Sequence, residues 1–119
     1  MIPTVVYPAL HGAAPVAAIV GTRIYRDFAG NAPTAPYIVW SLPATVPELN
    51  LSWGPPPTDR YSVSVDVFAL TEAQSDALVV AARDAMEAIG HVLTIQSLGR
   101  EPDTGLWRYT FDTDVFHNR

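Results

Sequence analysis

The chain has 119 residues, nearly half of them apolar, and a formal net charge of -5. A chain of this length and composition is expected to fold as one domain, residues 1–119, and it is too apolar to be disordered throughout. Its basic residues are all arginines, and so acidic a chain lacks the basic surface that tight nucleic-acid binding requires.

The composition excludes further classes of protein. Because the chain has no cysteine, it has no disulfides, thiolate metal ligands or cysteine nucleophiles. Prolines and charged residues interrupt the most apolar stretch, so it holds no run of about 20 apolar residues that could span a membrane. The first residues lack the positive charge of a secretory signal. We therefore expect a soluble protein that is made inside the cell.

The N-terminal part of the chain predicts two short helices within residues 4–21. Alanines and valines recur there at roughly helical spacing, but Pro8 and Pro15 interrupt the pattern. Pro15 suits the first turn of the second helix, and Gly21 suits its C-terminal cap. A short strand is expected at residues 23–28, where polar and apolar residues alternate.

The middle of the chain predicts a strand followed by a long, proline-rich loop. Residues 37–42 are rich in β-branched and aromatic side chains, and Pro43 and Pro47 are expected to end this strand. The loop at residues 43–60 includes three consecutive prolines and is stiff. It also carries large apolar side chains that need a partner to cover them, so we expect a contact there with another subunit or with another protein. These candidate interface residues are Leu49, Leu51 and Trp53.

Residues 60–68 show the clearest period of two in the chain and predict a strand with one apolar and one polar face. A capping box at Thr71 and Gln74 begins a helix expected to run to about Ile89, and Gly90 suits a left-handed cap. One side of this helix is apolar and is expected to pack on a sheet. Its residues are Leu78, Ala81, Ala82, Ala85 and Ile89.

Residues 92–98 and 106–116 predict two final strands that pair antiparallel through the turn between them. In the last strand, one face carries the aromatic row Trp107, Tyr109 and Phe111, followed by Thr113 and Val115, and is expected to face the core. The order of elements predicts an α+β fold. Its mostly antiparallel sheet has about four to five strands, with two helices packed on one face.

The sequence carries no recognisable catalytic or metal-binding motif. Its three histidines, His11, His91 and His117, do not have the spacing of metal ligands. The common nucleophile, phosphate and cofactor signatures are also missing. We therefore expect no enzyme activity, no cofactor and no metal.

Three carboxylates on polar strand faces form the one candidate cluster: Asp66, Asp112 and Asp114. Two readings of this cluster remain open. Neighbouring carboxylates could catalyse hydrolysis or bind a metal, but no histidine, asparagine or glycine-rich segment completes such a site. Acidic residues on a polar strand face are more commonly only hydrated.

The order of several short patterns resembles one protein family. An alanine-rich helix leads into Gly21-Thr22-Arg23-Ile24-Tyr25, then Pro36-Tyr37-Ile38-Val39, then Val63-Ser64-Val65-Asp66-Val67-Phe68-Ala69 and a helix opened by Thr71. Over about residues 5–115 the chain is similar to the small tail-completion proteins of long-tailed phages, the tail-terminator and tail-to-head joining family. It departs from that pattern in its proline-rich loop and in Pro8.

The resemblance implies a structural protein of the virion that catalyses no reaction. It implies a ring, commonly six-fold, that stops growth of the tail tube, caps it and joins it to the head connector. The implied partners are copies of the chain itself, the tail-tube protein and a head connector or stopper protein. The implied location is the head-proximal end of the tail, after synthesis in the bacterial cytoplasm. The alternative is another head–tail connector or minor tail component.

A ring through which DNA passes must not hold the DNA tightly, and an acidic chain without lysine is consistent with that requirement. We therefore form the hypothesis that some of Asp66, Asp112 and Asp114 face the channel. The competing interpretation is that these carboxylates are hydrated outside any channel.

Overall fold

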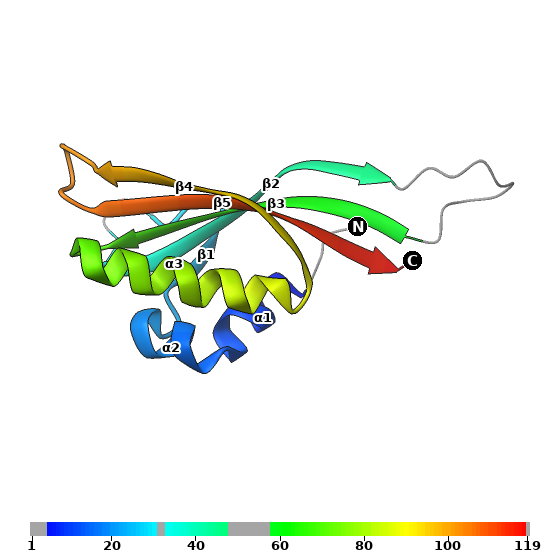
Figure 1. The fold of residues 1–119 in the computed structure, drawn as a ribbon, viewed down its shortest axis with the longest axis horizontal. Coiled ribbons are helices and arrows are strands. Elements are labelled where there is room, and N and C mark those ends of the chain that lie inside the picture. The colour runs from blue at the N-terminus through cyan, green and yellow to red at the C-terminus, as the bar shows by residue number, and fades with distance from the viewer. Residues whose placement is uncertain (1–4, 31–32, 48–57, 119) are drawn as a thin grey trace, which may run out of the picture.

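The computed structural model describes residues 5–30, 33–47 and 58–118 of the chain. Five strands form one sheet in the order β1-β2-β3-β5-β4, antiparallel except for the pair of β1 and β2. The helices cover one face, and no described element covers the other (Figure 1). In chain order the elements are α1 (Val6–Gly12), α2 (Ala14–Val20), β1 (Ile24–Arg26), β2 (Tyr37–Pro47), β3 (Thr58–Ala69), α3 (Glu72–Glu87), β4 (Gly90–Arg100) and β5 (Trp107–Asn118). The predicted α+β class and mostly antiparallel sheet are confirmed.

The N-terminal segment forms two short helices, as predicted for residues 4–21, so with α3 the described chain has three helices where the fold class was expected to have two on one face of the sheet. Pro15 lies in the first turn of α2, and Gly21 caps that helix with a positive φ of 60°, both as predicted. Pro8 does not interrupt α1, because it lies in the first turn, where its missing N–H would have no partner within the helix. The break between the helices lies instead at Ala13, whose backbone is extended.

The strands on either side of the proline-rich segment are longer than predicted. Pro43 does not end β2, which continues to Pro47. The register with β3 shifts between Ser41 and Ala44, and such an irregularity accommodates a proline because it interrupts the ladder of hydrogen bonds. β3 begins at Thr58. Both strands therefore extend into the segment that was expected to be a loop.

The core lies between the sheet and the helices. The alternation predicted for β3 is confirmed, because the apolar side chains at alternate positions from Tyr61 to Val67 have no exposed surface. In β5 the predicted core row is confirmed at Phe111, Thr113 and Val115, whereas Tyr109 is only partly buried. The Tyr109 hydroxyl donates a hydrogen bond of 2.7 Å to Asp76 Oδ1, which ties β5 to α3.

The long helix α3 begins at the predicted capping box. Thr71 Oγ1 accepts from the Gln74 N–H at 3.1 Å, and Gln74 Oε1 accepts from the Leu70 N–H at 2.9 Å. The four residues from Leu78 to Ala85 that were predicted to face the sheet are buried, and Ile89 is partly buried. The prediction for Gly90 is wrong. The helix ends at Glu87, and Gly90 begins β4, where it lies against the Asp114 carbonyl.

Candidate functional site

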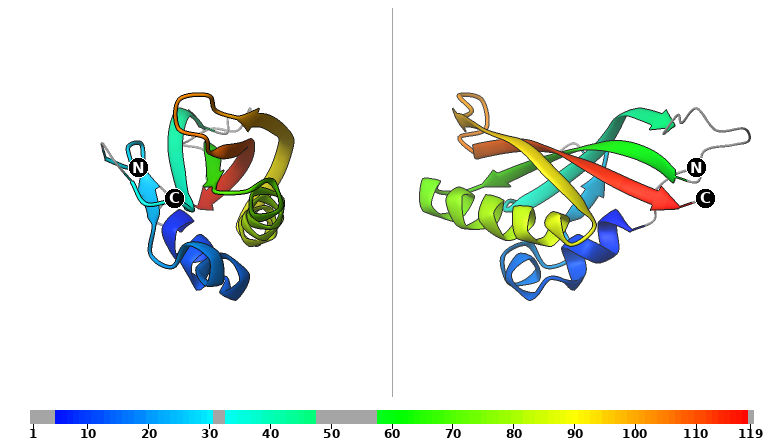
Figure 2. Two further views of the ribbon diagram at one scale, coloured as in Figure 1. Left: turned by 90° about the vertical axis from the view of Figure 1, so that its left-hand side faces the viewer. Right: turned by 45° about the vertical axis from the view of Figure 1, so that its right-hand side comes forward.

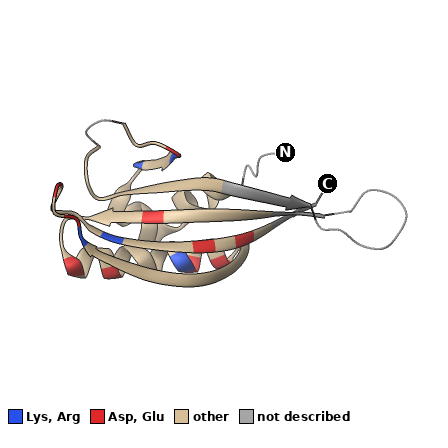
Figure 3. Cartoon of the chain, turned by 90° about the horizontal axis from the view of Figure 1, so that it is seen from above, with Lys and Arg blue, Asp and Glu red and all other residues tan. Residues whose placement is uncertain are grey.

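Three carboxylates predicted on polar strand faces lie on the same open face of the sheet. β3 and β5 pair antiparallel, with Ser64 opposite Asp112 and Ser62 opposite Asp114, while Asp66 lies opposite Thr110. Neighbouring residues of both strands are buried beneath the helices, so these positions point away from the helices. Figure 3 looks onto this face and shows the acidic positions along the two central strands. We call it the open face.

Side chains of the neighbouring strand contact Asp112 and Asp66. Asp112 Oδ1 accepts a hydrogen bond of 2.7 Å from the Ser64 hydroxyl, and Asp66 Oδ2 lies 3.3 Å from Arg108 Nη2. The side chain of Asp66 is 23% exposed and that of Arg108 is 31% exposed, so solvent screens their attraction. Asp66 and Asp112 are therefore each tied to a side chain of the neighbouring strand.

A row of aromatic rings crosses one end of the open face. Arg108 lies 5.1 Å from the centre of the Phe68 ring, and Phe68 stacks on Tyr37 with the ring centres 4.6 Å apart. Tyr25 meets Tyr37 edge-on, so the row joins β5, β3, β2 and β1. Burial, reinforced by the negative charge of Glu101 and opposed by Arg108, raises the pKa of the Tyr37 hydroxyl. The row covers the sheet at this end and stiffens the pairing of its strands.

A shallow depression of about 380 Å³ lies beside this row. Phe28, Tyr37 and Phe68 contribute apolar lining, and Asp27 and Asp66 contribute charge. It is wide open to solvent and lacks the enclosed apolar walls typical of a small-molecule site.

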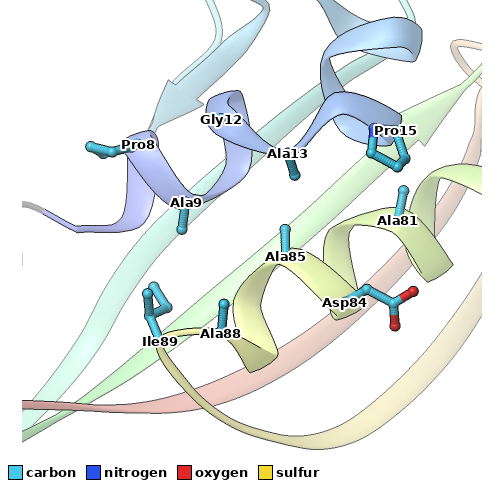
Figure 4. Close-up of a pocket in the computed structure, with 10 residues that line it drawn as sticks. All are labelled: Pro8, Ala9, Gly12, Ala13, Pro15, Ala81, Asp84, Ala85, Ala88 and Ile89. Carbon is cyan, nitrogen blue, oxygen red and sulfur yellow. The ribbon is translucent and has the colours of Figure 1, made fainter.

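A second hollow, of about 500 Å³, lies between the N-terminal helices and α3. Figure 4 shows small side chains on both walls, with Ala9, Gly12 and Ala13 across from Ala81 and Ala85. Asp84 is its one charged lining residue, and this carboxylate pairs with Arg83 at 3.0 Å. Three alanines of α3 are enclosed by this packing, because Ala82 is fully buried and Ala81 and Ala85 nearly so.

The histidines do not converge. His11 on α1 stacks on Tyr7 with the ring centres 5.3 Å apart, His91 is exposed on β4, and His117 lies near the end of β5. Within the described ranges, no three histidine, aspartate or glutamate side chains gather where they could hold a metal. The predicted interface residues Leu49, Leu51 and Trp53 lie outside the described residues.

Sequence reasoning missed a second surface, at the edge of the sheet. Strand β4 pairs only with β5 among the described strands. Three of its apolar residues are exposed, namely Leu93 at 47%, Ile95 at 38% and Leu98 at 41%. The signal was present in the sequence, because residues 90–99 contain no charged side chain. What the sequence lacked was the strand order, which makes β4 an edge.

Comparisons with known proteins point to one family. The family described as Tail completion protein gp17 matches this chain over residues 4–118. A solved structure titled "Virion of native gene transfer agent (GTA) particle" contains a chain of similar fold, with a TM-score of 0.63 and 21% sequence identity. The similarity covers 96% of this chain and 92% of that one. No protein of curated function matches the sequence.

Of the helices described, none is both long and apolar enough to cross a bilayer.

Proposed function

Because this chain belongs to the Tail completion protein gp17 family, and is thus a structural protein of the phage tail, we propose that it caps the tail tube as a ring, commonly six-fold, and joins the tail to the head connector. Its partners are copies of itself, the tail-tube protein and a connector or stopper protein of the head. Its place is the head-proximal end of the tail. In this role the chain catalyses no reaction and binds no cofactor.

The family match over nearly the whole chain is the observation that carries this proposal. Two features of the molecule support it. Only 16% of the residues are charged, so a large share of the surface is suited to contacts with other subunits. On the open face, Asp66 contacts Arg108 and Asp112 accepts from Ser64, so these carboxylates are engaged with the neighbouring strand rather than arranged around a substrate pocket. We further propose that Leu49, Leu51 and Trp53 contribute to the contact with a neighbouring subunit or with the tail tube.

Loss of this protein is expected to leave heads and tails unjoined. Particles made without the gene should show separate filled heads and tails of abnormal length in electron micrographs. Purified protein added to such a lysate should restore joined particles, and a density should appear at the head-proximal end of the tails. Joined particles of normal tail length in the absence of the gene would contradict the proposal.

We also propose that the carboxylates of the open face, Asp66, Asp112 and Asp114, line the channel through which DNA passes. Negative charge there repels phosphate and keeps the DNA from binding to the wall. The same three side chains lie on one face of two paired strands, which is what a channel lining requires.

The channel proposal predicts slower DNA ejection from particles that carry asparagine at all three positions. Asparagine keeps the size of aspartate and one acceptor oxygen, which the Ser64 hydroxyl can still use at position 112, but removes the charge, so particles should still assemble. The matched control replaces Asp84 and Asp103 by asparagine and Glu87 by glutamine, three carboxylates that lie off the open face, and changes the net charge equally. Ejection kinetics, followed by dye binding to released DNA, should slow only in the first variant. Equal rates in both variants would place the three carboxylates outside the channel.

A further inference from the structure

Most of the exposed large apolar side chains of the described chain lie at the two edges of the sheet. Seven such residues are more than about a third exposed, and four of them lie on β4 and on the adjoining side of α3. The most exposed, Phe28 at 70%, follows β1 at the opposite edge. The remaining two are Tyr7 on α1, which contacts β1, and Leu70 between β3 and α3.

The first edge, which we call the β4 side, consists of Leu93, Ile95 and Leu98 on β4 with Val80 on α3. Val80 lies one helical turn after Asp76, whose carboxylate accepts the hydrogen bond from Tyr109 of β5, the neighbour of β4. Proteins usually protect a long edge strand with charges or prolines. Residues 90–99 have neither, and only two shifts of register interrupt the strand.

The second edge, which we call the β1 side, consists of β1 with Arg23, Asp27 and Phe28. Strand β1 has three residues and pairs only with β2 among the described strands. Arg26 lies 5.5 Å from the centre of the Trp40 ring, and Arg23 donates to the main-chain carbonyls of Pro36 and Ile19. The left view of Figure 2, which looks along the molecule, shows β1 and β4 at opposite edges of the sheet, with α3 below β4.

Charge makes these two sides complementary. The chain is acidic overall, and two carboxylates of α3, Glu72 and Asp76, lie close enough to Tyr109 of β5 to act on its hydroxyl, on the side of α3 that faces β4. The β1 side carries two arginines against one aspartate, and because Asp27 Oδ2 lies 3.7 Å from Arg26 Nε, one positive charge is left in excess on this side of an anionic molecule. Two β4 sides facing each other would bring together the carboxylates of two α3 helices, whereas a β1 side meeting a β4 side brings arginines toward them.

Strand direction also permits the contact between different edges. β1 runs parallel to β2, and successive antiparallel pairings make β4 antiparallel to β1. A copy in the same orientation, placed beside β4, would present its β1 antiparallel to that strand. A contact between two different surfaces can repeat around a ring, while a contact between two identical surfaces ends at a dimer.

We propose that the β4 side of one copy binds the β1 side of the next, so that head-to-tail contacts between sheet edges build the ring. This inference rests on the proposed function, because it assigns the surface that joins the subunits. The partner of each edge is therefore a second copy of this chain.

Thiol crosslinking tests this arrangement directly, since the natural chain has no cysteine. The double variant Phe28→Cys with Leu98→Cys, treated with a short bismaleimide on assembled tails, should give a ladder of crosslinked chains that ends at the ring size. A mixture of the two single variants should give only dimers. A control double variant, Leu70→Cys with Leu98→Cys, should give no ladder.

Each result decides between partners. Dimers from Leu98→Cys alone would show β4 meeting β4 and would overturn the inference. Crosslinks to a different virion protein, identified by mass spectrometry, would overturn it as well. A ladder together with tails that still lack heads would leave the edge contact standing and contradict the proposed function. Capped, joined tails without any ladder would contradict the edge contact and leave the proposed function standing.

A charged substitution on the β4 side tests the same contact between subunits by a second measurement. Ile95→Asp is expected to weaken self-association by about tenfold or more, as is common for a central apolar residue of an interface. Leu70→Asp is the matched control, because Leu70 is more exposed, at 57%, and lies on neither edge. Circular dichroism of both variants should match that of the natural chain. Equal association of the two variants, measured by analytical ultracentrifugation, would overturn the inference.

Discussion

Replacing Phe111 by alanine is expected to lower the free energy of unfolding by about 3–5 kcal/mol. Phe111 is 1% exposed and belongs to the core cluster between the sheet and the helices. Its strand lies between β3 and β4, and Phe111 is opposite Val65 on one side and Ile95 on the other. Removing the ring leaves a cavity that the neighbouring strands cannot close without losing their pairing.

The loss should be large relative to a typical domain stability of about 5–15 kcal/mol. Urea unfolding followed by circular dichroism at low protein concentration measures it. The matched control is Phe28→Ala, which removes the same ring from a side chain that is 70% exposed and should change stability by at most about 0.5 kcal/mol. Equal losses in the two variants would contradict the position of Phe111 in the core.

Replacing Gly90 by alanine is expected to destabilise the fold by about 1–3 kcal/mol. A Cβ at this position would clash with the carbonyl oxygen of Asp114 and would come within 3.1 Å of Thr113 Cγ2. The carbonyl belongs to β5, so relief of the clash requires movement of one of the paired strands. Because β4 begins at Gly90, the variant should also impair assembly through the β4 side.

Gly12→Ala is the control for this change, since a Cβ there would meet nothing within 4 Å. Gly12 is the last residue of α1, and alanine at an unstrained helical position is expected to stabilise by about 0.4–1 kcal/mol. The two substitutions should therefore shift the thermal midpoint in opposite directions. A midpoint unchanged by Gly90→Ala would mean that β4 does not approach β5 as closely as described.

Local chemistry explains which features the sequence made predictable. Alternation of apolar and polar residues identified β3 and its buried face, and the Thr71 capping box identified the beginning of α3. Gly21 and Pro15 marked the limits of α2. Each of these signals depends on residues within a few positions of one another, so a linear reading captures it.

Features that depend on pairing between distant segments were missed or left open. Pro43 was expected to end β2, but the strand continues because its register with β3 shifts at that point. Gly90 was expected to cap a helix, whereas its small size is needed against β5. Arg108 gave no signal of its partnership with Asp66, since the two are 42 positions apart in the sequence and meet only through the pairing of β3 with β5.

The amino-acid sequence by itself determined the α+β class, the apolar and polar faces of the strands and the sharing of one polar strand face by Asp112 and Asp114. Only the tertiary structure decided that Asp66 joins them on the open face and that β4 lies at an edge with its apolar side chains exposed. The physical reason is that side-chain periodicity is a local property of the backbone. The order of strands in a sheet is set by packing between segments that are far apart in the chain.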